Sequence, residues 1–564
     1  MKIINETEAV KLIKDNDTLG IGTSSAGWTV PEALLKKLGE VYHKEKHPKN
    51  LTLSVAITPG AFSNEKLGIN HLTEEGLVGK LISAHVNAGK TFAKCISSNQ
   101  FPTYTIPLGI YGKLLRSSAA GEIGYLTHIG LNTFADPRLE GCKANKKATE
   151  DIVQLVNING KEQLLYKSYP IDICFIRASY ADKQGNISFE KEPIKGDQVT
   201  LAAAVHNQGG IVVVQVNKII NHIKTKEVAI HKSLVDYVVV CNDIYSYIEE
   251  YPKYTSKLFE NKKYKINLTK KIMNLNSRKI CARRAILELN FGDVINLGVG
   301  MPETVAKIAD EEGISSSMTL SVEMGALGGI PLGGKAFGVS LHPEAIMNII
   351  HTMDLYDGGY LDATILGLAE IDKAGNVNVS KFNERLAGPG GFIDISQTTK
   401  KVIFIGTFTS IGLKEKVENN KLRIIEEGKV IKFKKKVDQI TFSAKEAINN
   451  NQKVLYITER AVFELTKEGV TLIEIAPGID LKKDILSKME FEPIISRNLT
   501  LMDDKIFLNQ LMGLSTNTIV DSKKKNYISV IKKFANFKKE SIISAIYKNI
   551  PGLRNISNSK KIGG

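Results

Sequence analysis

The chain has 564 residues, of which 43% are apolar, 24% are charged and only 16 are proline. This composition excludes a small disulfide-stapled scaffold, a fibrous protein and a disordered protein, and at about 150 residues per domain the length predicts two to four domains. The net charge is +15, and residues 515–564 hold 11 Lys/Arg against two acids, so most of the surplus lies in this tail. The remaining charge suits an anionic small ligand as well as it suits nucleic acid.

The first residues and the cysteines bear on the cellular compartment and on metal chemistry. Glu6 and Glu8 interrupt the stretch where a signal peptide needs an apolar core, and no apolar stretch approaches the length of a membrane-spanning helix. We therefore expect a cytoplasmic protein with no membrane span. The five cysteines are widely spaced and the ten histidines show no metal-ligand spacing. We expect unpaired, buried cysteines and no metal.

Apolar strands alternate with helical segments along the chain, which is typical of α/β domains with a mainly parallel sheet. In the first half, a helix is predicted over residues 32–42. In the second half, helices are predicted over 304–312 and 461–468. The lysine- and asparagine-rich stretch 251–277 is the expected linker between the halves.

Three short matches in the same order indicate an internal duplication. The matched segments are 19–22 with 297–300, 182–186 with 372–376, and 211–214 with 402–405. The offset is larger for the first pair than for the other two, so the first copy should contain an insertion, for which residues 70–145 are the candidate. We predict two tandem, related three-layer αβα domains with mainly parallel sheets, at 1–264 and 278–514, followed by the tail.

The densest glycine cluster of the chain, 321–334, follows a strand predicted over 318–321. Glu323 is therefore expected where a strand ends and a glycine-rich turn begins, at the edge where open α/β sheets bind ligands. A carboxylate flanked by glycines is accessible, and free backbone N–H groups nearby can stabilise charge around it. The alternative is that Glu323 is a solvated turn residue.

A second glycine cluster covers residues 387–392. Because Pro389 has no N–H, only Gly388, Gly390 and Gly391 can offer backbone donors to an oxyanion or a phosphate in this segment. The alternative is an ordinary loop between two strands.

At these segments the chain resembles the family I coenzyme A transferases, in the single-chain acetate/propionate CoA-transferase branch that fuses both subunit types of the family. The segments that carry the resemblance are 127–141, 321–329, 356–359, 375–382 and 386–392. The likeness covers residues 1–514. Glu323 matches the catalytic glutamate of the family's S-E-N-G-like motif, with Met324 in place of the asparagine.

The resemblance implies an enzyme that moves CoA between a short-chain acyl-CoA (acetyl-, propionyl- or butyryl-CoA) and a carboxylate acceptor. Coenzyme A would be a substrate, and no cofactor is implied. The reaction would be ping-pong, through a thioester between CoA and Glu323. Gly388, Gly390 and Gly391, with Asn378 nearby, would contact the thioester region. The resemblance also implies that the chains form a homo-oligomer, specifically a homotetramer.

Two other functions stay open at this point: an acyl-CoA hydrolase on the same fold, in which water reaches the glutamyl thioester, and a non-enzymatic ligand-sensing protein. Glu323 within its glycine context argues against the second. The tail 515–564 lies outside the resemblance, and its apolar residues recur at helical spacing beside lysines, which predicts a basic amphipathic helix. This helix could cover the protein's own surface, dock on a partner subunit or touch an anionic membrane. Because no nucleic-acid recognition motif accompanies it, no nucleic-acid partner is expected.

Overall fold

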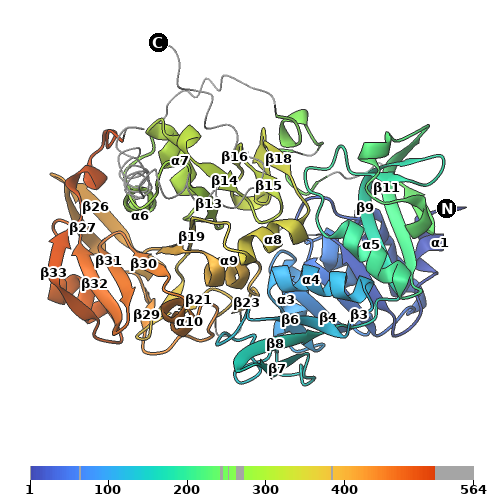
Figure 1. Ribbon diagram of the computed structural model, residues 1–564, viewed down its shortest axis with the longest axis horizontal. Helices are drawn as coiled ribbons and strands as arrows, with labels where there is room; N and C mark the ends of the chain where they lie inside the picture. Colours follow the sequence, from blue (N-terminus) through green and yellow to red (C-terminus); the bar gives the residue numbers. More distant parts are fainter. Residues whose placement is uncertain are drawn as a thin grey trace, which may run out of the picture.

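A computed structural model describes residues 2–23, 25–61, 65–241, 246–251, 253–261, 272–382 and 385–514. These residues form two α/β halves, each built on its own sheet (Figure 1). The predicted α/β class is confirmed. The tail 515–564, with its predicted amphipathic helix, lies outside the described residues, as does part of the expected linker. The domain boundaries at 264 and 278 stay predictions.

The first half is built on a nine-stranded sheet in which only β10 runs antiparallel to its neighbour. The order is β1 (Lys2–Ile3), β12 (Tyr237–Val240), β11 (Ile211–Ile220), β9 (Ile173–Asp182), β2 (Thr18–Gly22), β3 (Leu51–Ile57), β4 (Val78–His85) and β5 (Thr103–Thr105), with β10 (Ile187–Ser188) beside β9. Its helices are α1 (Glu6–Val10), α2 (Glu32–Glu45), α3 (Lys90–Ser97), α4 (Leu108–Ala119) and α5 (Gln198–Asn207). The first three share one hydrophobic core, and α4 and α5 pack into another.

The second half is built on a ten-stranded sheet with a parallel centre. The order is β18 (Ala345–Ile346), β15 (Ala326–Leu327), β14 (Thr319–Ser321), β13 (Val294–Leu297), β19 (Ala363–Gly367), β24 (Lys401–Ile405), β30 (Lys453–Ile457), β31 (Ala461–Thr466), β32 (Gly469–Ile475) and β33 (Ile494–Leu501). Its helices are α6 (Ser277–Ile286), α7 (Thr304–Glu311), α8 (Ile349–Asp357), α9 (Phe392–Thr398) and α10 (Ala444–Asn449).

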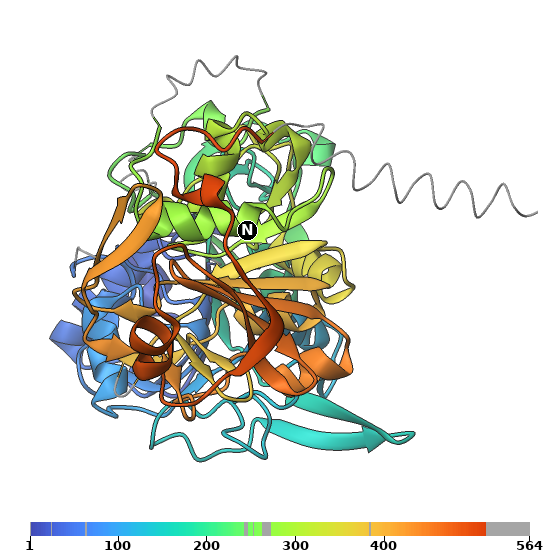
Figure 2. The same ribbon diagram turned by 90° about the vertical axis from the view of Figure 1, so that its left-hand side faces the viewer.

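Four two-stranded and two three-stranded small sheets accompany the two main sheets among the described residues. They are β6 (Gly124–Thr127), β7 (Val153–Ile158) and β8 (Lys161–Lys167); β16 (Ile330–Pro331) and β17 (Ser340–Leu341); β20 (Glu370–Asp372), β21 (Val377–Asn378) and β29 (Phe433–Lys434); β22 (Lys381–Phe382) and β23 (Arg385–Leu386); β25 (Thr409–Ser410) and β28 (Val430–Ile431); and β26 (Lys414–Glu418) and β27 (Lys421–Glu426). The β7–β8 hairpin projects from the body of the molecule (Figure 2). The insertion in the first half, predicted over residues 70–145, therefore extends past residue 145 to the end of β8.

The two sheets share a strand order, which confirms the predicted duplication. The order β12-β11-β9-β2-β3 in the first half corresponds to β30-β24-β19-β13-β14 in the second. The Asp172 carboxylate accepts the N–H of Thr18 at 2.7 Å, and Asp362 accepts that of Val294 at 3.0 Å. These two equivalent bonds align Thr18 of the first half with Val294 of the second. The sequence match of 19–22 with 297–300 is therefore shifted by two residues from the structural alignment of the halves.

The predicted helix over 461–468 is wrong, because this segment forms β31. Its residues Ala-Val-Phe-Glu-Leu-Thr pair antiparallel with β30 on one side and β32 on the other. Most of them are β-branched or large apolar residues, which fit a buried strand between two neighbours. The segment is also too short for its periodicity to separate a helix from a strand.

One hydrophobic core joins the two halves. Helices α4 and α5 of the first half and α8 and α9 of the second contribute buried side chains to the same continuous cluster. Helices α6 and α7 belong to a separate cluster behind the second sheet. Each sheet is thus covered on both faces, and the helices α4, α5, α8 and α9 form a shared layer, which we call the inner helix layer.

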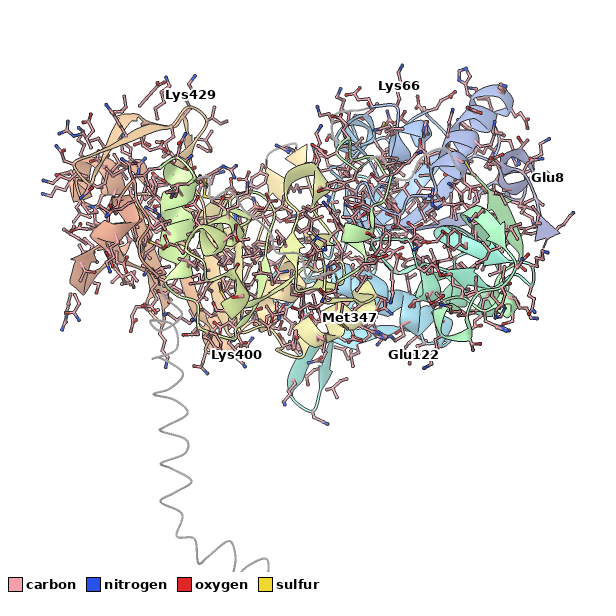
Figure 3. All side chains as sticks on the ribbon, turned by 90° about the horizontal axis from the view of Figure 1, so that it is seen from above. Glu8, Lys66, Glu122, Met347, Lys400 and Lys429 are labelled. Carbon is pink, nitrogen blue, oxygen red and sulfur yellow. The ribbon has the colours of Figure 1, made fainter. Side chains whose placement is uncertain are left out.

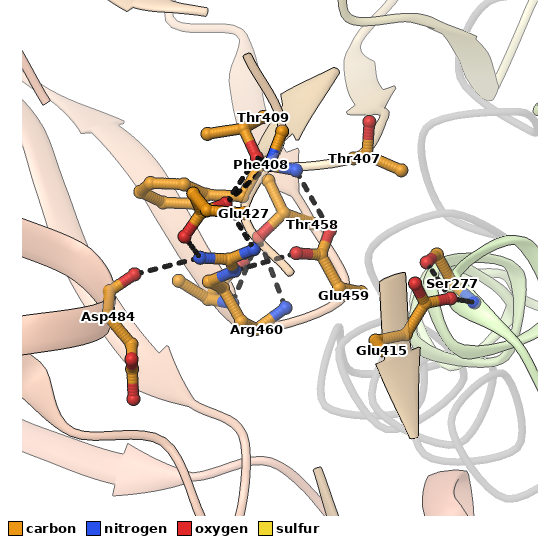
Figure 4. A network of polar contacts seen from close by, with 12 residues as sticks. Ser277, Thr407, Phe408, Thr409, Glu415, Glu427, Thr458, Glu459, Arg460 and Asp484 are labelled. Carbon is orange, nitrogen blue, oxygen red and sulfur yellow. Dashed lines mark hydrogen bonds and ion pairs between the residues drawn. The ribbon is translucent and has the colours of Figure 1, made fainter. Parts of the chain in front are cut away.

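A buried ionic network closes the carboxyl ends of β24 and β30 (Figure 4). The Arg460 guanidinium binds both carboxylate oxygens of Glu427 at 2.9 and 3.0 Å and Glu459 at 2.7 Å. Glu459 also accepts the N–H of Phe408 at 2.8 Å, and the Phe408 ring lies 4.9 Å from the guanidinium carbon. Because both carboxylates contact the same buried guanidinium, this part of the sheet edge is a structural element.

The five cysteines are buried and form no disulfide in the described structure, as predicted. Within the described ranges, no group of three or more His, Cys, Asp or Glu side chains is placed to hold a metal ion. No helix among the described residues is long and apolar enough to cross a membrane.

Candidate functional site

Glu323 lies in a tight turn directly after β14. The N–H of Val322 donates to the carbonyl of Ala326 at 2.8 Å, and the N–H of Gly325 donates to the carbonyl of Val322 at 2.9 Å. Gly325 has φ of +119°, and a Cβ there would lie 2.1 Å from the carbonyl oxygen of Met347. Only glycine fits this position. The predicted strand end and glycine turn are therefore present, and the turn fixes where the Glu323 side chain begins.

The Glu323 carboxylate is partly buried without a compensating charge. The side chain is half-buried, and its neighbours Val322 and Met324 are buried. Within the described part of the chain, no hydrogen bond or ion pair reaches the carboxylate. Burial alone raises the pKa of Glu323 to about 7. A solvated turn residue would show no such shift. The burial of Glu323 therefore favours a functional carboxylate over a solvated turn residue.

The glycine cluster 387–392 meets Glu323 at Gly391. A Cβ on Gly391 would lie 2.4 Å from Oε2 of Glu323, so the glycine backbone packs directly on the carboxylate. The amides of Gly388 and Gly390 already donate to the carbonyls of Ser380 and Ala84, at 3.1 and 2.9 Å. Among the three glycines predicted to offer donors, only Gly391 has an amide with no hydrogen bond to another described residue.

Asn378 is fully buried and its polar atoms are occupied. Its Nδ2 donates to the carboxylate of Glu370 at 2.7 Å and to the carbonyl of Lys381 at 2.6 Å, while its Oδ1 accepts the N–H of Ser380 at 3.0 Å. Ser380 in turn holds Gly388. This geometry gives Asn378 a role in supporting the glycine loop, and it does not favour the predicted contact with a substrate.

Helix α8 braces the strand that carries Glu323. The helix begins after Asn348, whose side chain accepts the N–H of His351 at 2.8 Å as an N-cap. At its second-last residue, the Tyr356 hydroxyl shares a hydrogen bond with Oγ of Ser321. From the same helix, the Met353 methyl packs against Gly391. The carboxylate is thus held between α8 and the start of α9.

The site lies where the two halves meet. A Cβ on Gly338 would contact Met324 of the second half at 3.2 Å and Ser25 of the first at 3.8 Å. From the other side, the carbonyl of Gly390 accepts the N–H of Leu108, the first residue of α4, at 2.9 Å. Figure 3 shows Met347, whose N–H donates to the carbonyl of Gly325 in the Glu323 turn at 2.9 Å, between the two halves. A carboxylate in this setting can act as a nucleophile or as a general base.

Comparison with known proteins identifies the family. A family model described as Coenzyme A transferase matches residues 4–241. Caffeate CoA-transferase from Acetobacterium woodii is 42% identical over 523 residues, which cover 91% of this chain and 99% of that protein. The chain belongs to the coenzyme A transferases. Acetate CoA-transferase YdiF from Escherichia coli K12 is 40% identical over 514 residues, covering 91% of this chain and 96% of YdiF.

The fold of this transferase matches a solved relative. The crystal structure of the acyl-CoA transferase YdiF from Escherichia coli O157:H7, in a thioester complex with CoA, has a TM-score of 0.85 and 39% sequence identity. The match covers 91% of this chain and 97% of YdiF. The predicted two-half CoA-transferase fold is therefore confirmed.

Sequence reasoning missed the residues that the first half contributes to the transferase site. Leu108 and the β4 end at Ala84 hold the glycine loop through backbone atoms, which leave no residue-type signal. The segment 127–141, which carries part of the family resemblance, lies at the same junction, where the N–H of Gly130 donates to Oε1 of Gln397 on α9 at 2.8 Å. Its role in this structure is to join the halves.

Proposed function

We propose that the protein transfers CoA from a short-chain acyl-CoA to a carboxylate acceptor through a covalent thioester on Glu323. The observation that carries the proposal is the partly buried, unpaired Glu323 carboxylate packed on Gly391 at the junction of the halves. Buried carboxylates without a partner cost folding stability, so they are expected mainly where chemistry requires them.

In the first half-reaction, a carboxylate oxygen of Glu323 attacks the thioester carbonyl of the donor. The carbon–sulfur bond breaks, which leaves a mixed anhydride on Glu323 and a CoA thiolate. The thiolate then attacks the glutamyl carbonyl, and the anhydride bond to that carbonyl breaks. The donor acid leaves as a carboxylate, and CoA remains bound as the glutamyl thioester.

In the second half-reaction, the acceptor carboxylate repeats these steps in reverse. It attacks the glutamyl thioester, forms an anhydride and releases the CoA thiolate. The thiolate attacks the acyl carbonyl of the acceptor, so the new acyl-CoA forms and Glu323 regains its carboxylate. No proton or electron is consumed over the cycle.

Three features of the site suit this chemistry. Poor solvation raises the pKa of Glu323 to about 7 and makes its ionised form a stronger nucleophile than a solvated carboxylate. The free amide of Gly391 is a candidate donor to the oxyanion of the tetrahedral intermediates. The rigid glycine turn limits motion of the carboxylate, and placement is the main source of rate for a weak nucleophile.

The acid substrates are proposed as short-chain acids such as acetate, propionate and butyrate. The names of the two relatives point to different acids, caffeate and acetate. A panel of these four acids, each labelled with carbon-13 and offered with unlabelled acetyl-CoA, decides between them when the masses of the labelled thioesters are read. Preference for caffeate over all three short-chain acids would contradict the proposed substrate class.

Trapping the intermediate tests the mechanism. Acyl-CoA supplied without an acceptor should convert the enzyme to the glutamyl thioester, which borohydride reduces to an alcohol. Peptide mapping should place this alcohol at Glu323, and activity should be lost permanently. A label on another residue, or normal turnover by Glu323→Ala, would contradict the proposal. Release of free CoA and acid at the rate of turnover would identify a hydrolase instead.

We also propose that the chains assemble into a homotetramer, in line with the family resemblance. Light scattering of the active protein at assay concentration measures the mass directly. A fully active monomer would contradict this assembly.

A further inference from the structure

Helix α4 reaches from the first half to the turn that carries Gly391. The N–H of Leu108 donates to the carbonyl of Gly390 at 2.9 Å, and the N–H of Gly109 donates to Oδ2 of Asp394 on α9 at 3.2 Å. A Cβ on Gly109 would lie 2.4 Å from the other oxygen of Asp394. Two consecutive amides of α4 therefore hold both ends of the turn that packs on Glu323.

One turn further along, α4 also holds α8. Lys113 is 3% exposed, and its ammonium forms an ion pair with Asp357 at the end of α8. Helix α8 is the element that places Met353 against Gly391 and binds Ser321 through its tyrosine. The contacts of α4 thus reach both elements that flank the Glu323 carboxylate.

The buried charges in this contact do not balance if all groups are ionised. Asp394 is fully buried, Asp357 is nearly so, and Lys113 is the buried cation beside them. Each of the two aspartates has one carboxyl oxygen without a hydrogen bond to a described residue. A second buried carboxylate with no cation of its own is strongly unfavourable, so one of the two should carry a proton.

The neighbouring charges do not supply the missing cation. At the solvent-exposed rim, Arg116 pairs with Asp354 at 2.9 Å, and Asp354 lies 3.6 Å from the Lys113 ammonium. Burial and then the charge of Asp357 raise the pKa of Asp394 well above its usual range. Burial raises the pKa of Asp357 too, but Lys113 opposes that shift. The other titratable groups that face the contact are Tyr125, His128 and Tyr166.

We propose that Lys113 is a positioning residue for the reaction at Glu323, although it belongs to the other half of the chain. Its ion pair with Asp357, together with an uncharged Asp394 carboxyl group on the N–H of Gly109, holds α8 and α9 against the Glu323 carboxylate. This inference rests on the proposed function of Glu323. It adds that the first half helps to position the Glu323 carboxylate.

The variant Lys113→Met tests the ion pair. It leaves Asp357 buried without a cation, and kcat should fall about tenfold to a hundredfold, since a displacement of about 1 Å is enough for such a loss. The KM for acyl-CoA should change less than twofold. Arg116→Met, which removes an exposed cation from the same helix, is the matched control and should keep kcat within twofold.

The double variant Lys113→Met/Asp357→Asn separates positioning from simple folding. It removes the unpaired buried charge, so the thermal midpoint should return toward that of the wild type. The kcat should stay low, because no ion pair holds α8. If kcat recovers together with the thermal midpoint, Lys113 has only a structural role and the proposal is overturned.

The charge state of Asp394 has its own test. Asp394→Asn keeps an acceptor for Gly109 and should retain kcat within threefold, whereas Asp394→Ala should lose kcat about as much as Lys113→Met. Infrared difference spectra at pH 8 between wild type and Asp394→Asn should show a protonated carboxyl band in the wild type. An equal loss in both variants, or absence of the band, would overturn the neutral carboxyl. The kcat ratios of these variants to the wild type can be measured whichever residue borohydride labels. Failure of this inference can therefore be distinguished from failure of the Glu323 proposal.

Discussion

The same four residues, Thr-Leu-Ser-Val, occur at equivalent positions in both halves, at 52–55 within β3 and at 319–322, where the first three form β14. The first residue of each copy donates its N–H to the carbonyl of an aspartate, Asp17 in one half and Asp293 in the other, at 3.0 Å. The serine of each copy shares a hydrogen bond with a buried tyrosine, Tyr111 of α4 or Tyr356 of α8. The two strands are therefore equivalent in sequence, position and contacts.

The halves differ at the residue that follows. In the first half this residue is Ala56, which is 1% exposed and continues β3. In the second half it is Glu323, where the chain leaves the sheet and turns. The shared tetrapeptide serves the fold, because it is kept in both halves. The carboxylate serves the chemistry, because it is present in one half and has no partner there. This separation of roles can be tested.

Moving the carboxylate between the halves should have the largest effect. Glu323→Ala should reduce transfer to the background rate, and adding Ala56→Glu should not restore it. Because position 56 lies inside a strand with no room for a charge, that second change should lower the free energy of unfolding by about 2–4 kcal/mol. Steady-state assays and urea unfolding measure the two effects. Any recovery of transfer in the double variant would break the distinction between the halves.

Displacing the carboxylate within the second half should come next. In Gly391→Ala, the new Cβ would lie 2.4 Å from Oε2 of Glu323. A shift of about 1 Å should lower kcat on the order of a hundredfold. Gly367→Ala is the matched control, because a Cβ there meets nothing within 4 Å, and its kcat should be unchanged. Equal kcat values for the two variants would show that the contact with Gly391 is unimportant.

The pH dependence should report the unpaired state of Glu323. Since burial raises the pKa of Glu323 from 4.5 to about 7, transfer should increase with pH up to about 7 and level off above it. The folded protein binds this proton more tightly than the unfolded chain, so stability falls as pH rises from 4.5 to about 7, and the loss is complete above that range. The free energy of unfolding of Glu323→Gln, measured by urea titration, should therefore exceed that of the wild type by about 1–3 kcal/mol at pH 8. At pH 4 the two values should be equal. Wild type more stable than the variant at pH 8 would contradict the burial argument.

The two tyrosines give the smallest and most specific comparison. Tyr111→Phe and Tyr356→Phe remove equivalent hydroxyls, and each should lower the free energy of unfolding by about 1 kcal/mol. Only Tyr356→Phe should lower kcat, by a few-fold, because its partner Ser321 is two residues from Glu323. The same kcat loss in both variants would indicate a general effect on packing.

The position of Glu323 was predictable because strand ends and glycine turns leave local signals in the sequence. The Gly388–Gly391 segment was predictable for the same reason, but not which of its amides stays free. That depends on which backbone carbonyls accept these amides, those of Ser380 and Ala84, and Ala84 belongs to the other half of the chain. Asn378 shows a further limit, since a buried amide and a ligand-binding amide have the same sequence signature.

The register of the duplication illustrates a different limit. A glycine pattern suggested the match of 19–22 with 297–300, but glycines recur at many turns and carry little register information. The repeated Thr-Leu-Ser-Val was available in the sequence and gives the correct register, because its side chains make specific contacts in both halves. The error at 461–468 has a tertiary origin: β31 is a strand because β30 and β32 lie on either side of it.

The inner helix layer has a consequence for how this protein can be divided. Because α4, α5, α8 and α9 share one core, either half expressed alone would expose a broad apolar surface and tend to aggregate. Produced together as separate polypeptides, the halves would associate as an obligate pair, since the surface between them is a domain core cut in two. The covalent connection therefore mainly guarantees equal amounts of two parts that non-covalent forces already keep together.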